Sequence, residues 1–120
     1  MIRSFKDLDV YKESYDLAVL INREVNKLPF FEKNDLGSQL RRASKSVPSN
    51  VAEGWGKRRF IKEFQYHLEI ALGSCNEMEV HLGLAKDLHY LSAVFCEAVL
   101  LRYQLLGGKI VNLRRNWKTQ

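Results

Sequence analysis

The sequence predicts an all-α protein, an antiparallel up-down-up-down four-helix bundle. Apolar residues recur at spacings of three and four along four long stretches, which is the period of a helix with about 3.6 residues per turn. The connections between these stretches are short, and no stretch alternates as a strand would. Four amphipathic helices with short connections bury their apolar sides most simply in such a bundle. Residues 1–120 are expected to form one domain, because this length supports a single core.

The first helix is expected to run to about Lys27, after a short extended arm of residues 1–6. Asp7 or Asp9 is a suitable N-cap, because a carboxylate there accepts hydrogen bonds from free backbone N–H groups. The chain should leave the helix at Leu28, because the residue before a proline is disfavoured in the helical region.

Phe30 and Phe31 follow this proline, and we expect them to plug the end of the bundle.

The second helix should open between Glu32 and Asp35. Its apolar side is spaced by four, three, four, four and three, over Leu36, Leu40, Ala43, Val47, Val51 and Gly54.

Pro48 interrupts this second helix, because proline lacks a backbone N–H and clashes with the carbonyl group four residues earlier. The alternatives are one helix kinked at Pro48 and two helices with a turn at 46–49. The apolar spacing passes through Pro48 without losing phase, which favours the single kinked helix. Gly54-Trp55-Gly56 should end it.

The third helix is expected from about Phe60 to Leu88. Small residues along it indicate where another backbone comes close, from this chain or from another one: Ala71, Gly73, Ser74 and Gly83. The fourth helix should begin after Ser92, a suitable N-cap, and continue past Gly107-Gly108 because its apolar spacing survives there.

The composition indicates an ordinary soluble, cytosolic protein. No apolar run is long enough to cross a membrane, and the N-terminus has no secretory signal. Cys75 and Cys96 are isolated from each other and from histidine, so we expect buried thiols rather than a disulfide or a zinc site.

Positive charge is concentrated in two segments of the chain. Residues 41–62 carry seven basic residues and one acid, Glu53, and residues 109–120 carry four basic residues, including Lys118, and no acid. The rest of the chain holds eight basic and thirteen acidic residues. This distribution suits a protein that binds a phosphate backbone, because each neutralised phosphate releases condensed counterions. The alternative is a basic surface that is simply solvated.

The candidate nucleic-acid contacts are eight basic residues of these segments: Arg41, Lys45, Lys57, Arg58, Arg59, Lys62, Arg114 and Arg115. Trp55 and Phe60 lie among them. Either ring is able to stack on an unpaired base, or to close the end of the bundle instead.

A polar stripe follows the apolar side of the second helix: Gln39, Arg42, Ser46, Asn50 and Glu53. One interpretation is a hydrogen-bonded seam, in which Arg42 pairs with a carboxylate of another helix and Asn50 satisfies the backbone near Pro48. The other is that the stripe lines a ligand surface together with the neighbouring basic residues.

No catalytic, metal or cofactor signature is present, so we expect neither an enzyme nor a cofactor-binding or small-molecule-binding protein. Glu77-Met-Glu-Val-His81 lacks the Glu-x-x-His spacing of di-iron bundles. His67 and His81 are about 21 Å of helical rise apart and cannot share a metal ion. Both are expected at the surface or at an interface. The glycine-rich segment at Gly54 also lacks the spacing of a phosphate loop.

Several segments resemble the four-helix-bundle proteins encoded in intervening sequences of bacterial 23S ribosomal RNA genes. The segments are Phe5-Lys-Asp-Leu8 with Val10-Tyr11, Gln39-Leu-Arg-Arg-Ala43, Ser46-Val-Pro-Ser-Asn-Val-Ala-Glu-Gly54, Lys62-Glu-Phe64 and Ile70-Ala-Leu-Gly-Ser74. Tyr11 stands where the family often has tryptophan, and Cys75 where leucine is common.

The resemblance implies an antiparallel four-helix bundle that assembles into a ring-like homopentamer. It also implies kinship with the accessory proteins of diversity-generating retroelements, which have a similar fold and bind nucleic acid. No catalytic role is assigned to the family's motif residues, here Gln39, Arg42, Ala43, Ser46, Pro48, Asn50, Glu53, Gly54, Phe64, Gly73 and Ser74.

Charge and resemblance together favour a non-enzymatic, oligomeric protein that binds RNA or DNA. The alternative is a homo-oligomeric protein-interaction scaffold that binds no nucleic acid.

Overall fold

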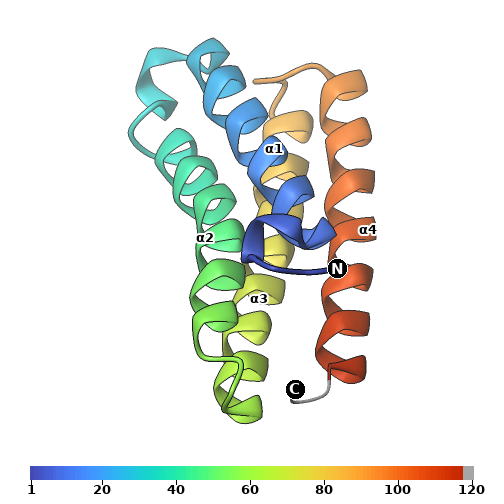
Figure 1. Ribbon diagram of the computed structural model, residues 1–120. Coiled ribbons are helices and arrows are strands. Elements are labelled where there is room, and N and C mark those ends of the chain that lie inside the picture. The colour runs from blue at the N-terminus through green and yellow to red at the C-terminus, as the bar shows by residue number, and fades with distance from the viewer. Residues whose placement is uncertain (118–120) are drawn as a thin grey trace.

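The computed structural model describes residues 1–117 and contains four α-helices and no strand in that range (Figure 1). The helices are α1 (Asp9–Glu24), α2 (Leu36–Gly56), α3 (Ile61–Asp87) and α4 (Ala93–Asn116). Short 3₁₀ turns η1 (Phe5–Asp7), η2 (Val25–Lys27) and η3 (Phe30–Glu32) precede or connect them. The predicted all-α fold is confirmed.

Consecutive helices run antiparallel, as Figure 1 shows. Asn22 near the end of α1 donates to Ser44 in the first half of α2. At the two ends of the α3–α4 pair, Lys86 lies 3.5 Å from Glu97, and Arg114 pairs with Glu69. The result is a rod of 48 × 23 × 21 Å in which the α2–α3 turn and the end of α4 lie at the same end.

Each helix contributes fully buried apolar side chains to a single core. The largest of them are Leu17, Ile21, Leu40, Phe64, Leu68, Met78, Leu82, Tyr103, Leu106 and Ile110. Cys75 and Cys96 are also buried and free, as predicted. The apolar periodicity of the sequence therefore identifies the faces that meet inside the bundle.

The arm before α1 is only partly extended, and its cap differs from the prediction. Ser4 caps the turn η1, and Asp7 completes a capping box by accepting from the backbone N–H of Ser4. The N-cap of α1 is Leu8, which provides no side-chain hydrogen bond. Asp7 does not cap α1, because its carboxylate already accepts hydrogen bonds from the backbone at the start of η1.

Pro48 lies inside one continuous helix, α2, as the apolar spacing predicts. Its ring is buried, and the Ser49 hydroxyl donates to the carbonyl of Lys45 at 2.9 Å. Hydrogen bonds from serine to backbone carbonyl groups are a common accompaniment of irregular turns in helices. Ser92 caps α4 by accepting from the backbone N–H of Phe95, and α4 continues through Gly107-Gly108.

The prediction that Phe30 and Phe31 plug the bundle end is wrong. The 3₁₀ turn η3 leaves their side chains 87% and 72% exposed. Leu28, Leu36 and Leu91 are buried near that end instead. Helical spacing does not extend through this connection, so the sequence pattern could not determine which of its apolar residues turn inward.

None of the helices in residues 1–117 combines the length and apolarity that a membrane span requires.

Candidate nucleic-acid interface

The fold brings the later part of the first basic segment, residues 57–62, and the end of α4 in the second segment to the same end of the bundle. Trp117, just after α4, packs edge-to-face on Trp55 at the end of α2 and on Phe64 at the start of α3, with ring centroids 5.6 and 5.0 Å apart. These contacts hold the end of α4 against the α2–α3 turn. Arg114 and Arg115 therefore lie at the same end as the turn that carries residues 57–60.

Arg3 of the N-terminal arm also lies at this end of the bundle, and the sequence did not predict this position. It lines a small pocket together with Ile2, Trp55, Arg58, Arg59 and Trp117. Its arm is held by Asp7, whose carboxylate accepts from the backbone N–H groups of Arg3 at 2.8 Å and Ser4 at 3.1 Å. Because the arm has no helical period, no pattern in the sequence placed it there.

Three basic residues of this end already have partners. Lys57 lies 3.7 Å from the Glu53 carboxylate, and Arg114 pairs with Glu69. The guanidinium of Arg58 stacks 4.2 Å from the centre of the Trp55 ring and donates to the Trp55 carbonyl at 2.9 Å. Such exposed ion pairs contribute little energy and compete weakly with a polyanion.

Arg59, Lys62 and Arg115 are exposed, and in residues 1–117 none of them forms an ion pair with a carboxylate. Together with Arg3, Lys57, Arg58 and Arg114 they form what we call the basic end. Of the other two basic residues of the second segment, Lys109 is exposed further back on α4, and Lys118 lies outside the described residues.

Arg41 and Lys45 lie elsewhere on the molecule. Arg41 is half-buried near the start of α2, where it donates to the carbonyl of Lys33 at 2.9 Å. It is sixteen residues before Lys57, or about 24 Å of helical rise. Lys45 lines an apolar groove of about 680 Å³ between α1 and α2, with Tyr15 on its wall. These two residues are not part of the basic end.

The two aromatic residues named with the basic segments have different environments. Trp55 is only 8% exposed and packs against Trp117 and Arg58, so it closes the bundle. Phe60 is 64% exposed at the start of α3, in an open surface hollow that Arg59, Lys62 and Glu63 also line. Phe60 is therefore an aromatic ring of the basic end that can stack on a base.

The polar stripe of α2 faces α3 and forms a hydrogen-bonded seam. Arg42 lies 3.6 Å from Glu77 of α3 and pairs with Gln39 on its own helix. The Ser46 hydroxyl accepts from Ser74 of α3 at 2.8 Å. The first interpretation of the stripe, with Arg42 bound to a carboxylate of another helix, agrees with these contacts.

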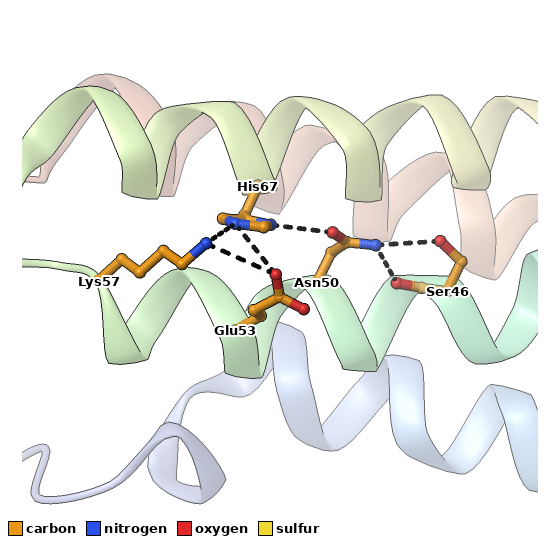
Figure 2. Close-up of polar contacts among 5 residues, drawn as sticks. All are labelled: Ser46, Asn50, Glu53, Lys57 and His67. Carbon is orange, nitrogen blue, oxygen red and sulfur yellow. Dashed lines mark hydrogen bonds and ion pairs between the residues drawn. The ribbon is translucent and has the colours of Figure 1, made fainter.

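Figure 2 shows the centre of this seam, where His67 points from α3 toward Asn50 and Glu53 of α2 and Lys57 just after it. Asn50 donates through Nδ2 to the carbonyl and hydroxyl of Ser46, so its Oδ1 atom is an acceptor. His67 Nδ1 lies 3.1 Å from that oxygen and must carry the proton. The other ring nitrogen, Nε2, lies 3.1 Å from Lys57 Nζ and 3.3 Å from Glu53 Oε2.

His67 can thus accept from Lys57 when neutral or donate to Glu53 when protonated, and it has a partner in either state. It is 5% exposed, so the expectation of a surface or interface histidine is wrong. Gly54 allows this approach, because a Cβ at that position would lie 2.9 Å from His67 Cβ. The sequence contained the signal: Gly54 is in phase with the apolar side of α2 and close to the Asn50–Glu53 stripe.

His81 occupies the other half of the seam and is less well partnered. Its Nε2 atom is 3.9 Å from Glu77, and neither ring nitrogen has a hydrogen-bond partner in the described chain. Burial lowers the pKa of His81, as does the charge of Arg42, whereas Glu77 acts in the opposite direction. Residues 1–117 contain no cluster of three or more metal-ligating side chains.

Fold and site together define a four-helix-bundle protein with a basic end, a polar seam between α2 and α3, and an exposed ring, Phe60, beside unpaired basic side chains. The chain belongs to the family of 23S rRNA-intervening sequence proteins, whose sequence pattern it matches over residues 6–112. No curated protein is similar enough to match this chain.

Proposed function

We propose that this protein is a non-catalytic, homo-oligomeric nucleic-acid-binding protein of the cytoplasm, and that its basic end binds unpaired RNA or DNA. The observation that supports this most is that basic residues of both segments and Arg3 lie at one end of the bundle, where the exposed ring of Phe60 adjoins Arg59 and Lys62. Membership of a family described by a ribosomal RNA intervening sequence agrees with an RNA-associated role.

The chemistry of the basic end suits a single strand. Arg59, Lys62 and Arg115 are free to neutralise phosphates, and each neutralised phosphate releases counterions. Phe60 offers a ring face, and base stacking on an aromatic side chain contributes about 1–3 kcal/mol per base without sequence preference. A paired helix hides its base faces, so it gains only the electrostatic part of this interaction.

The test is binding of a labelled single strand across a salt series, measured by fluorescence anisotropy. Affinity should fall steeply between about 50 and 200 mM salt, and replacing Arg59 or Lys62 by Gln should reduce the log–log slope by about 0.7 for each phosphate that is no longer neutralised. Arg23→Gln is the matched control, because Arg23 is an exposed arginine at the end of α1, away from the basic end. A flat salt dependence would contradict the proposal.

A substitution of Phe60 distinguishes base stacking on a single strand from attraction by charge alone. Phe60→Ala removes an exposed ring, so the protein should fold normally while its affinity for a single strand falls by about five- to a hundredfold. Affinity for a duplex of the same length should change little. Equal losses for both nucleic acids would indicate that the ring does not stack on bases.

Self-association is proposed through the outer sides of α3 and α4. Exposed apolar residues follow helical spacing there: Val80 and Leu84 on α3 with Leu88 just after it, and Val94, Leu101 and Leu105 on α4. Contiguous exposed apolar surface usually marks an interface. A Cβ added at Gly73 or Gly83 of α3 would meet no atom of another described helix within 4 Å, which leaves room for a second copy. A pentamer would repeat the basic end five times and add weak contacts by multivalency.

The second candidate is a protein-interaction scaffold that binds no nucleic acid, which the same apolar surface favours. Partners captured from cell extract distinguish the two functions. Partners that remain after nuclease treatment support the scaffold, whereas partners released together with the nucleic acid support the basic end.

A further inference from the structure

A pocket of about 190 Å³ lies within the basic end, where the N-terminal arm meets the ends of α2 and α4. Its walls carry three arginines, Arg3, Arg58 and Arg59, and no carboxylate. Trp55 and Trp117 also line it, next to the carbon atoms of Ile2. The pocket is therefore narrow, cationic and partly apolar, which is unusual for a merely solvated charge patch.

The guanidinium group of Arg58 is positioned before any ligand arrives. It is held by its stack on Trp55 and its hydrogen bond to the Trp55 carbonyl, which uses Nη1 and leaves other N–H groups free. The backbone of Arg3 is held beside it, because the Arg3 N–H group donates to Asp7. A fixed guanidinium group binds oxyanions well, because little side-chain entropy is lost and two parallel hydrogen bonds can form.

We propose that this pocket binds the terminal phosphate of a nucleic-acid strand, an inference that rests on the proposed function of the basic end. A terminal phosphomonoester carries a charge of about −1.5 to −2 near pH 7, whereas a phosphodiester inside a strand carries −1. A narrow pocket also admits a strand end more easily than a strand that continues in both directions. The adjoining open hollow shares Arg59 and contains Phe60, so the first nucleotides of the strand continue there.

The experiment compares one single-stranded oligonucleotide in three forms: with a 5′-phosphate, with a 3′-phosphate, and with hydroxyl groups at both ends. Binding of one phosphorylated form should be about ten- to a hundredfold tighter than that of the hydroxyl form, as expected for several hydrogen bonds to a charged group. Inorganic phosphate should reduce this preference by competing for the pocket.

Arg3→Gln is the diagnostic variant, because Arg3 is exposed on the arm and is not needed for the core. It should bring the affinities for the phosphorylated and hydroxyl forms to within about twofold of each other, whereas the affinity for the hydroxyl form should fall only by the salt-dependent contribution of one basic residue. Arg23→Gln, at the opposite end of α1, should retain the preference.

Acidification provides an independent readout. A phosphomonoester loses charge as the pH falls through about 6, whereas arginine stays protonated, so the preference should shrink between about pH 7.5 and 5.5. Equal affinity for all three oligonucleotides, with salt-dependent binding intact, overturns the terminal-phosphate site alone. Absence of binding to every form overturns the proposed function as well.

Discussion

Gly54 controls how closely α2 and α3 approach at the polar seam. A Cβ there would lie 2.9 Å from His67 Cβ and 3.1 Å from a ring carbon of Phe64. Both neighbours are buried on α3 and cannot move away without disturbing the core. The smallest side chain is thus required for the seam to form.

Gly54→Ala should therefore destabilise the protein by about 1–3 kcal/mol, the usual cost of overpacking. Gly56→Ala is the matched control in the same helix, because Gly56 is exposed and a Cβ there would meet no atom of another described element within 4 Å. Urea unfolding followed by circular dichroism measures both. A neutral Gly54→Ala would show that the helices can separate at this point.

Cys75 is a buried thiol whose environment determines its reactivity. Burial raises the pKa of Cys75 to about 12, and the charge of Glu79 acts in the same direction. Burial also raises the pKa of Cys96. Thiolates are the reactive form, so both residues should be inert in the folded protein.

This raised pKa keeps the Cys75 thiol protonated at about pH 8, so a thiol reagent should label neither cysteine of the native protein and both in urea. Because the pKa of Cys75 is raised in the folded protein, the folded state keeps this proton at pH values at which the unfolded chain loses it. This residue's contribution to stability should therefore be intact below about pH 8.5 and decrease as the pH rises further. Rapid labelling without denaturant would contradict the buried position.

At the level of elements, the short turn η1 has a functional consequence because it positions Arg3. The backbone N–H groups of Arg3 and Ser4 donate to Asp7 and lower the pKa of its carboxyl group. This interaction is therefore complete above about pH 4 and is lost as the pH falls through the lowered pKa.

Asp7→Ala should release the arm without unfolding the bundle. Amide hydrogen exchange of Arg3 and Ser4 should become faster, while the urea midpoint stays unchanged, because η1 contains no buried residue. Asp16→Ala, an exposed aspartate within α1, should leave both amides protected. If exchange of Arg3 is unaltered by Asp7→Ala, the capping box does not hold the arm.

The helices themselves were largely predictable, whereas the segments between them were not. The predicted continuation of α2 through Pro48 and of α4 through Gly107-Gly108 is confirmed. Buried residues recur every three or four positions along a helix. The helical pattern therefore continues past a single residue that disfavours helix. Phe30 and Phe31 show the opposite case, because a 3₁₀ turn carries no such period.

At the scale of the whole molecule, the exposed apolar residues of α3 and α4 lead to a prediction about assembly. Replacing Leu101 and Leu105 together by Glu should convert the oligomer to folded monomers in sedimentation experiments, because both side chains are more than half exposed in the single chain. The helix content should not change.

Tyr15→Glu is the matched control, since Tyr15 is a half-exposed apolar residue of α1 beside the groove with Lys45. It should leave the oligomer intact. If Tyr15→Glu dissociates the protein and the α4 variant does not, self-association uses the α1–α2 groove instead. A wild-type protein that sediments as a monomer would contradict the proposal.

The sequence by itself determined the four helices, their buried sides and the existence of two basic segments, because periodicity and composition are local properties of the chain. It also identified the stripe from Gln39 to Glu53, although not its partners on α3. Only the tertiary structure decided that His67 is buried, that Arg41 and Lys45 lie apart from the other basic residues, and that Arg3 joins them. The physical reason is that antiparallel packing brings the end of α4 and the arm to the α2–α3 turn, through contacts between residues distant in sequence.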